Sequence, residues 1–305
     1  MKKLTLILAA FLLILTTGCS LEPPGWAKPK TGGDLKHIKI GLSVSTLNNP
    51  FFVSLKDGVV AEAKKHGMET IVVDAQNDSA KQSNDVDDLM QKGVNVLLIN
   101  PTDSAAISTV VQSANSLGIP VITLDRSADK GDVKALVASD NVKGGRMAAE
   151  FIEKTVGKGA KVVELEGVAG ASATRERGKG FHEVADKDLN VVAKQTADFD
   201  RTKGLNVMEN LLQAHPEVQA VFAHNDEMAL GAIEAIQSSG KNIPVVGFDG
   251  NEDALKSIKD GKLTATVAQQ PDLIGQMAVQ AAYDVLQGKT VEKSIPAPLK
   301  LVTKE

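Results

Sequence analysis

The sequence predicts an α/β protein with two doubly wound parallel-sheet lobes joined by a multi-strand hinge. The first observation is an internal repeat: segment 119–126, IPVITLDR, resembles segment 243–250, IPVVGFDG, and each is an apolar strand followed by polar or charged residues that include an aspartate. In both copies a helix-length segment, 104–117 or 227–239, leads into the strand. Because parallel sheets bind ligands beyond the carboxyl ends of their strands, a doubled strand-helix-strand unit predicts two lobes that face a shared cleft.

The second observation is the alternation of short β-branched runs with helical patterns from His37 onward. In the first half we expect strands at 38–44, 70–74, 94–99, 121–124 and 135–137, with helices at 51–66, 80–92 and 104–117. In the second half we expect strands at 161–165, 191–194, 220–223, 245–248 and 263–268, with helices at 175–185, 203–213 and 227–237. Such alternation predicts parallel sheets with helices on both faces.

The end of the chain predicts the hinge. A helix at 271–287 follows the last long strand of the second half, and a short strand at 299–302 follows that helix. We expect the chain to cross back to the first lobe here. If it crosses more than once, the hinge is a set of strands, and the motion is closure of two rigid halves.

Length and composition agree with two domains. The chain has 305 residues, more than one compact core usually supports, and its 43% hydrophobic content suffices for two cores. The 34 basic and 38 acidic residues are nearly balanced. Neither a nucleic-acid-binding surface nor an acidic tail is indicated.

The N-terminus predicts an exported, lipid-anchored protein. Lys2 and Lys3 precede an apolar run at 4–15 that is shorter than the roughly 20 residues of a membrane-spanning helix. Cys19 is the only cysteine, so a disulfide within the chain is impossible. Gly18 before this lone cysteine resembles the lipobox of bacterial lipoproteins, although Thr16 stands where that motif prefers leucine and Leu15 is one place further back.

We therefore expect a signal peptide at 1–18, a lipidated Cys19, and a flexible spacer at 19–36 that is rich in proline, glycine and charge. This would hold the folded part at the outer face of the cell membrane. The alternative is an unmodified cysteine without a function.

Polar side chains gather at the predicted strand ends. They are residues 45–49, 76–78, 100–103 and 125–126 in the first half, and 166, 199–200, 225–226, 249 and 269 in the second. Carboxylate, amide and guanidinium groups can each engage two adjacent hydroxyls, which is the chemistry that a polyol requires. Phe51, Phe52, Phe199 and Phe248 lie beside these groups, where a ring could cover the C–H face of a sugar.

Each of these residues also has a structural interpretation. At strand-to-helix junctions Asp78, Asp103 and Asp226 are better explained as helix caps. Phenylalanines belong to cores by default, although two successive ones, Phe51 and Phe52, cannot both face one core. Asp125 and Arg126 could form a surface ion pair, and adjacent strand residues should point in opposite directions. On residue type alone, segment 175–177 is a solvated charge run.

The sequence gives little support to an enzyme. The five histidines form no close metal-ligand pair, and the Gly-x-Ser-x-Gly and P-loop patterns are absent. Segment 167–173 only faintly suggests a dinucleotide turn, because its glycine spacing differs from Gly-x-Gly-x-x-Gly. No cofactor and no metal are expected.

Eight blocks of the chain resemble the bacterial D-ribose-binding proteins of the periplasmic-binding-protein family. They are STLNNPFFVSLKDG at 45–58, NPTDS at 100–104, TLDR at 123–126, ASDNV at 138–142, RERG at 175–178, ADFDR at 197–201, NDEMALG at 225–231 and VGFDG at 246–250. The resemblance covers His37 to Lys304. It implies a non-enzymatic, monomeric receptor that captures D-ribose between two lobes and delivers it to the permease and ATPase subunits of an ABC importer, with no nucleic-acid partner.

By position, the resemblance also implies the sugar contacts. They fall on Asn49, Phe51, Phe52, Asp125, Arg126, Arg177, Phe199, Asn225, Asp249 and Gln269. The implied first lobe comprises 37–139 plus 270–298, and the second comprises 140–269 plus 299–305.

Other readings stay open from the sequence. Within the same class the ligand could be allose, galactose or a furanone signal. A sugar-responsive repressor core shares the fold but would need a basic helix-turn-helix segment at the N-terminus. An exported carbohydrate enzyme would need a carboxylate pair acting on a glycosidic bond.

Overall fold

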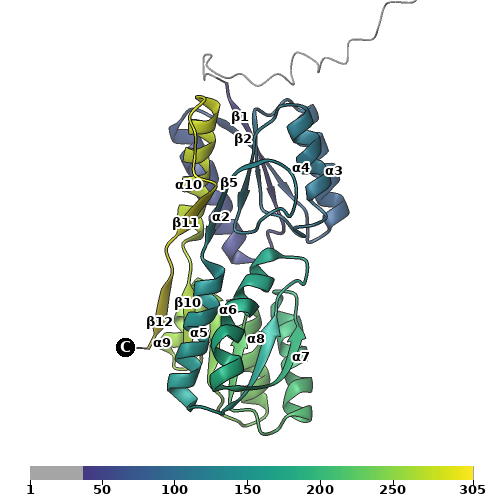
Figure 1. The fold of residues 1–305 in the computed structure, drawn as a ribbon. Coiled ribbons are helices and arrows are strands. Elements are labelled where there is room, and N and C mark those ends of the chain that lie inside the picture. Colours follow the sequence, from purple (N-terminus) through teal and green to yellow (C-terminus); the bar gives the residue numbers. More distant parts are fainter. Residues whose placement is uncertain (1–36, 305) are drawn as a thin grey trace, which may run out of the picture.

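The structure is a computed structural model that describes residues 37–304, folded into two lobes that lie one above the other in Figure 1. The sheet of the first lobe has the strand order β11-β5-β4-β3-β1-β2. Its strands are β1 (Lys39–Val44), β2 (Glu69–Asp74), β3 (Val96–Ile99), β4 (Val121–Leu124), β5 (Val133–Ser139) and β11 (Ser294–Ala297). All neighbours in this sheet are parallel, as the sequence predicted.

The sheet of the second lobe has the order β12-β10-β9-β8-β6-β7. Its strands are β6 (Lys161–Glu166), β7 (Asn190–Thr196), β8 (Ala220–Ala223), β9 (Val245–Asp249), β10 (Ala265–Ala268) and β12 (Lys300–Thr303). Strand β12 is antiparallel to β10, which the expectation of parallel sheets did not include. The reason is the route of the chain. After β11 of the first lobe it enters the second lobe from the hinge, and β12 runs along the edge of the sheet away from the hinge.

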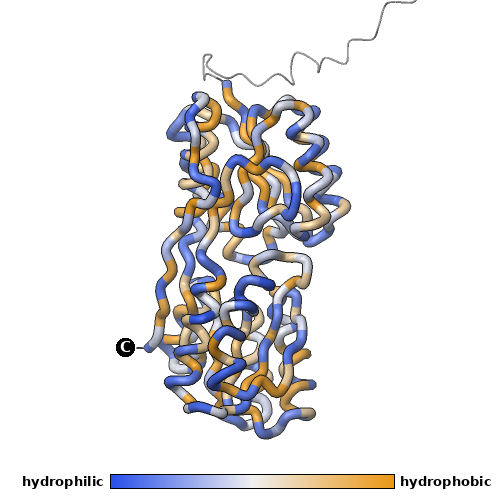
Figure 2. Tube along the Cα trace, viewed as in Figure 1, coloured by the Kyte–Doolittle hydropathy of each residue, from blue (hydrophilic) through white to orange (hydrophobic). Residues whose placement is uncertain are grey.

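Helices cover both faces of each sheet, and each face carries its own buried hydrophobic cluster. In the first lobe α2 (Pro50–Lys65) and α10 (Pro271–Leu286) cover one face, and α3 (Ser79–Gln91) and α4 (Ser108–Ser116) cover the other. In the second lobe α5 (Asn141–Val156) and α6 (Ser172–Asp188) face α7 (Arg201–Ala214), α8 (Asp226–Ser238) and α9 (Glu252–Lys259) across the sheet. Figure 2 shows the hydrophobic residues along the central strands.

The chain passes between the sheets three times, after β5, after β10 and between β11 and β12. Helix α10 therefore packs in the first lobe although it follows β10 of the second, and Figure 1 shows it with the N-terminal helices. These crossings form the multi-strand hinge that the sequence predicted. Their number favours rotation of two rigid halves over free movement on one linker.

Four elements differ from the prediction, each for a local reason. Helix α5 was not anticipated because Gly144 and Gly145 weaken its helical pattern. Strand β11 was not anticipated because it contains Pro296, and a proline argues against a strand. It lies at the edge of the sheet, where a proline is tolerated. Helix α9 has only 8 residues and was also missed. Helix α4 begins at Ser108, four residues later than expected, because a separate turn precedes it, in which Asp103 Oδ1 accepts from the N–H groups of Ala105 and Ala106.

The predicted signal peptide at 1–18, the lipidated Cys19 and the spacer at 19–36 lie outside the described residues. Among the helices between residues 37 and 304, none has the length and hydrophobicity to cross a membrane.

Candidate functional site

The structure brings nine of the ten predicted ligand residues to one pocket between the lobes. They are Asn49, Phe51, Phe52, Asp125, Arg126, Arg177, Phe199, Asn225 and Asp249. The tenth, Gln269, lies just behind them, and its Nε2 donates to Asp249 Oδ1 at 2.9 Å. Ala173 also lines the pocket, and sequence reasoning did not select it because its methyl group carries no polar signal.

The start of helix α2 forms one wall of the pocket. The side chain of Asn49 caps this helix by accepting from the N–H of Phe51 at 3.0 Å, and Pro50 suits the first helical position. Phe51 and Phe52 follow in the first turn, with ring centroids 5.2 Å apart and planes at 89°. Both rings line the pocket and both belong to the core cluster of the first lobe. The expectation that they cannot both face one core is therefore wrong, because successive residues of a helix point about 100° apart and not in opposite directions.

Asp125 and Arg126 both reach the pocket because the backbone turns at the end of β4. Asp125 has a φ of 63°, the left-handed region that non-glycine residues rarely adopt, so the two side chains do not diverge as adjacent strand residues would. Arg126 Nη1 donates to the carbonyl of Pro101 at 3.0 Å. Its guanidinium lies 5.1 Å from the ring centroid of Phe52 and 5.2 Å from that of Phe199, so it contacts both lobes.

Arg177 is the main cation of the second lobe. It is 3% exposed, and its guanidinium donates to Asn141 Oδ1 at 2.9 Å and to the carbonyl of His224 at 2.6 Å. The same group lies 3.8 Å from the ring centroid of Phe248. Helix α6 can pack this close to α5 only because residue 145 of α5 is a glycine. A Cβ on Gly145 would lie 2.1 Å from the Arg177 carbonyl oxygen and would clash with it. The interpretation of segment 175–177 as a solvated charge run is therefore wrong for Arg177.

Of the three aspartates interpreted as helix caps, only Asp78 caps a helix, and Asp103 instead caps a turn, because the N-cap position of α4 is Ile107. Asp78 caps α3 by accepting from two backbone N–H groups, and Asp103 Oδ1 accepts from the N–H groups of Ala105 and Ala106 in the turn before α4. The prediction for Asp226 is wrong. Asn225 caps α8 instead, through the N–H of Met228, because its side chain stands one residue before the first helical position.

The ionised groups of the pocket balance one another. Asp125 and Asp249 supply two negative charges, and Arg126 and Arg177 supply two positive ones. Arg177 Nη1 lies 3.7 Å from Asp249 Oδ1, and Arg177 Nη2 lies 4.0 Å from Asp125 Oδ1. Burial raises the pKa of both carboxyl groups against the opposing effect of the arginines, and it lowers the pKa of Arg126 to about 10. A pocket without net charge suits a neutral ligand.

Three polar atoms of this site have no hydrogen-bond partner among the described residues although they are buried. They are Asp125 Oδ1, Arg126 Nε and Gln269 Oε1. Two are acceptors and one is a donor, which is the mixture that hydroxyl groups can satisfy. The empty space at the pocket is about 220 Å³, and this volume includes the part that opens to solvent. Its ligand must therefore be small.

A second set of contacts joins the lobes outside the pocket. The N–H of Ser104 donates to the carbonyl of Gly170 at 3.0 Å, and the N–H of Ser172 donates to Ser104 Oγ at 3.1 Å. Ser172 Oγ in turn accepts from the N–H of Ser127 at 2.9 Å. These hydrogen bonds hold the two halves in a closed arrangement.

A buried ionic cluster supports the second lobe behind Arg177. Glu164 of β6 has an exposed fraction of 0%, and its carboxylate lies 2.9 Å from His182 Nε2 and 2.8 Å from His224 Nε2. Burial alone would raise the pKa of Glu164, but the hydrogen bonds from both imidazoles outweigh it and lower the pKa to about 2. The hydrogen bond to Glu164 raises the pKa of His182 to about 9, against a smaller effect of burial.

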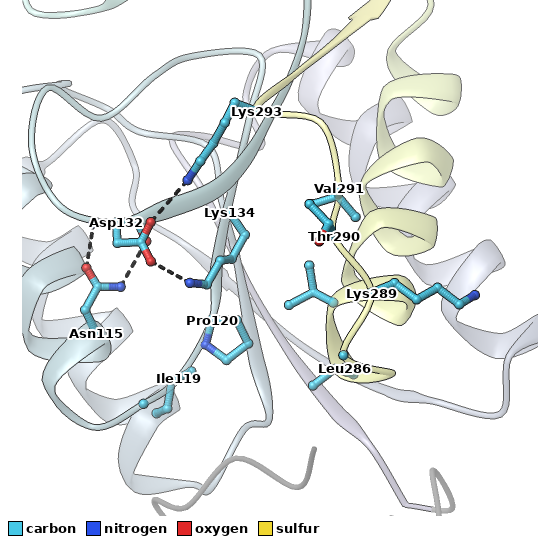
Figure 3. Close-up of a pocket in the computed structure, with 13 residues that line it drawn as sticks. Asn115, Ile119, Pro120, Asp132, Lys134, Leu286, Lys289, Thr290, Val291 and Lys293 are labelled. Atoms are coloured by element: carbon cyan, nitrogen blue, oxygen red, sulfur yellow. Dashed lines mark hydrogen bonds and ion pairs between the residues drawn. The ribbon is translucent and has the colours of Figure 1, made fainter. Parts of the chain in front are cut away.

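A larger groove lies elsewhere in the first lobe, where α4 and α10 end and β4 and β5 begin (Figure 3). Its apolar floor includes Ile119 and Leu286. Its carboxylate, Asp132, is already paired with Lys134 and Lys293, as the dashed lines in Figure 3 mark. Because it is remote from the strand ends that face the cleft and its charges are paired within the lobe, the smaller pocket is the functional candidate.

Comparison with known proteins agrees with this geometry. A family model described as "Periplasmic binding protein domain" matches residues 40–290. The chain is 69% identical to the ribose import binding protein RbsB of Bacillus subtilis over 305 residues, which is 100% of both chains. It is 58% identical to the protein of that name from Escherichia coli over 268 residues, 87% of this chain and 90% of the other.

Solved structures show the same fold. An ABC transporter solute binding protein from Mycobacterium smegmatis with bound glycerol superposes with a TM-score of 0.84 at 37% identity, covering 88% of this chain and 94% of that one. One from Actinobacillus succinogenes with bound D-allose has a TM-score of 0.80 at 29% identity, covering 88% and 98%. The chain therefore belongs to the periplasmic binding protein family, within the group that serves ABC importers.

Proposed function

We propose that this protein captures D-ribose between its two lobes and delivers it to an ABC-type ribose importer, and that it catalyses no reaction. The identity of 69% with a ribose import binding protein over the full length supports the ligand class. We further propose that the ten residues named from the sequence contact the sugar, with Gln269 acting both on the sugar and on Asp249.

The observation that carries the proposal is the charge-balanced pocket between the lobes. Two carboxylates and two guanidinium groups are all at most 4% exposed there, and aromatic rings from both lobes adjoin them. Such groups can bind hydroxyls in pairs, while the rings of Phe52 and Phe199 cover apolar C–H surface. A wrong or missing hydroxyl would leave a buried charged group unpaired, at a cost of about 1 to 3 kcal/mol. Binding should therefore discriminate sharply between sugars.

Calorimetric titration of the purified protein with a panel of pentoses and hexoses tests this proposal. We expect D-ribose to bind at least a hundredfold more tightly than D-glucose or D-arabinose, because each altered hydroxyl costs one or two such interactions. Ribose binding no tighter than glucose binding would refute the ligand assignment. Release of a new sugar product during the titration would refute the absence of catalysis.

We also propose how the lobes divide. Residues 37–139 with 270–298 would form one lobe and residues 140–269 with 299–305 the other. The placement of α10 and β11 in the first sheet's lobe and of β12 in the second sheet supports these boundaries. We propose in addition that the protein is a monomer that binds one sugar molecule.

Lipid attachment at Cys19 is the remaining part of the proposal. It rests on the lone cysteine that follows an apolar run and Gly18. Mass spectrometry of the protein recovered from membranes should show an acylated N-terminal cysteine. Cys19→Ala should release the protein from the membrane fraction without altering ribose affinity, and a variant that stays bound to the membrane would contradict the anchor.

A further inference from the structure

Asp226 is a buried carboxylate beside the pocket, and sugar contact does not explain it. Its exposed fraction is 0%, and it is not among the residues that line the pocket. The start of α8 does not require it either, because Asn225 already caps that helix. A carboxylate removed from water needs strong hydrogen-bond partners, and these partners show what Asp226 holds in place.

Both oxygens of Asp226 are engaged by the turn after β9 and by the neighbouring strand. Oδ2 accepts from the N–H of Gly250 at 2.7 Å and from the N–H of Asn251 at 2.8 Å. Oδ1 accepts from Thr266 Oγ1 of β10 at 2.7 Å. Strand β9 leaves room for the carboxylate, since a Cβ on Gly247 would lie 2.4 Å from Asp226 Oδ1. Three segments therefore surround the carboxylate: the turn after β9, strand β9 at Gly247, and strand β10 at Thr266.

The turn that Asp226 holds directly follows the pocket residue Asp249, which ends β9 in an unusual conformation. The φ of Asp249 is 126° and that of Gly250 is 80°. A residue other than glycine keeps such a conformation only where its surroundings enforce it. The two N–H groups that follow Asp249 donate to Asp226 and supply this restraint. With the backbone so fixed, the Asp249 carboxylate lies within reach of Gln269 and Arg177.

We infer that Asp226 is a positioning residue: it holds the turn after β9, thereby fixes the carboxylate of Asp249, and so sets sugar affinity and selectivity without touching the sugar. The inference rests on the proposed function, which supplies D-ribose as the probe. A merely structural Asp226 would behave differently, because its hydrogen bonds would stabilise the second lobe and leave affinity unchanged.

The test is a double-mutant cycle measured by calorimetric titration with D-ribose and its epimer D-xylose. The proteins are the parent, Asp226→Asn, Asp249→Asn and the double variant. Asp226→Asn keeps the size of the side chain but removes its charge. With its amide oxygen turned to the two N–H groups it accepts more weakly than the carboxylate, and with its NH₂ turned to them it cannot accept at all. Thr266→Val is the matched control, because it removes the one hydrogen bond to Asp226 that does not come from the turn. Thermal melts without sugar report the stability of each protein.

We expect Asp226→Asn to weaken ribose binding at least tenfold, and less than threefold when Asp249 is already Asn. The ratio of ribose to xylose affinity should change in the same direction for both single variants. Thr266→Val should lower the melting temperature but change affinity less than threefold. Parental affinity in Asp226→Asn, or a tenfold loss that persists in the double variant, would overturn the inference. If Asp226→Asn does not fold, Asp226→Glu displaces the turn while keeping the charge, and the same criteria apply.

A crystal structure of unliganded Asp226→Asn gives a readout that does not depend on ribose. We expect the φ of Asp249 to leave the positive region, and an unchanged turn would overturn the inference. A parent protein that binds no ribose would refute the proposed function instead, and this crystal structure would still decide the role of Asp226.

Discussion

Gly170→Ala should impair closure of the lobes and weaken ribose binding without touching the pocket. Gly170 does not lie among the glycines with positive φ, so its backbone conformation suits alanine. The obstacle is the other lobe, because a Cβ on Gly170 would lie 2.0 Å from Asp103 Oδ2. The Asp103 side chain cannot move away freely, since its other oxygen accepts from two backbone N–H groups at 2.8 Å each.

The geometry gives the magnitude. A carbon–oxygen contact needs about 3.3 Å, so the lobes must separate by about 1.3 Å at this point. The hydrogen bond from Ser104 to Gly170, now 3.0 Å, would break, and the two that link Ser104, Ser172 and Ser127 would weaken. At about 0.5 to 1.5 kcal/mol each, closure becomes less favourable by about 1.5 to 3 kcal/mol. Ribose affinity should fall roughly 10- to 150-fold.

Calorimetric titration measures the affinity, and small-angle X-ray scattering with saturating ribose measures closure. Gly178→Ala is the matched control on the same lobe, because its Cβ would meet only ordinary contacts of 3.5 Å or more. Adding Asp103→Ala to Gly170→Ala should restore part of the affinity by removing the clash. Parental affinity together with parental scattering in Gly170→Ala would refute the reasoning.

Three further predictions concern single residues. Asp125→Ala should weaken ribose binding at least a hundredfold, since it leaves Arg126 without its nearest carboxylate and Arg177 with Asp249 alone. The melting temperature of the unliganded protein should change by only a few degrees, and a large fall in melting temperature beside the loss of affinity would mark Asp125 as structural. Arg126→Lys should weaken ribose binding about tenfold, because an ammonium group cannot replace the planar guanidinium between the rings of Phe52 and Phe199. An unchanged ribose affinity in calorimetric titration would contradict this. Glu164→Gln should destabilise the fold by about 3 to 5 kcal/mol in urea unfolding. Because the pKa of His182 is raised, its contribution to stability is complete below its ordinary pKa of 6.5 and is lost as the pH rises through about 9. Because the pKa of Glu164 is lowered, its contribution is complete above its ordinary pKa of 4.5 and is lost as the pH falls through about 2. The gap between parent and Glu164→Gln should therefore be widest between pH 4.5 and 6.5, and a gap that does not vary with pH would contradict the ion-pair assignment.

Much of the fold could be predicted from the sequence, because parallel strands and their helices leave periodic patterns and because the repeat at 119–126 and 243–250 reveals two equivalent units. The direction of β12 could not be predicted, since it depends on where the chain enters the second lobe. Helix α5 was missed for a related reason. Its Gly145 lowers helix propensity locally, and only the close approach of α6 explains why the glycine is there.

The site was harder to predict from residue types alone. The strand-end rule selected the segments that carry the pocket, and the resemblance selected residues within them. Neither showed the positive φ of Asp125 and Asp249, which depends on hydrogen bonds from distant segments. Glu164 went unnoticed because, two residues before Glu166 in the run KVVELE, it resembles an exposed strand position. The supporting role of Asp226 was hidden because an acidic first helical residue is a common sequence feature.

The cancellation of charge in the pocket bears on the speed of capture. Two acids and two guanidinium groups within one small volume produce a field that decays quickly with distance, and a sugar without charge would feel little of it in any case. Long-range attraction therefore does not speed the approach of the sugar to the open cleft. The association of oppositely charged partners, by contrast, is faster at low salt and is slowed when salt screens their attraction. The association rate of ribose should therefore be nearly the same in dilute buffer and in concentrated salt, which suits a receptor exposed to whatever medium surrounds the cell.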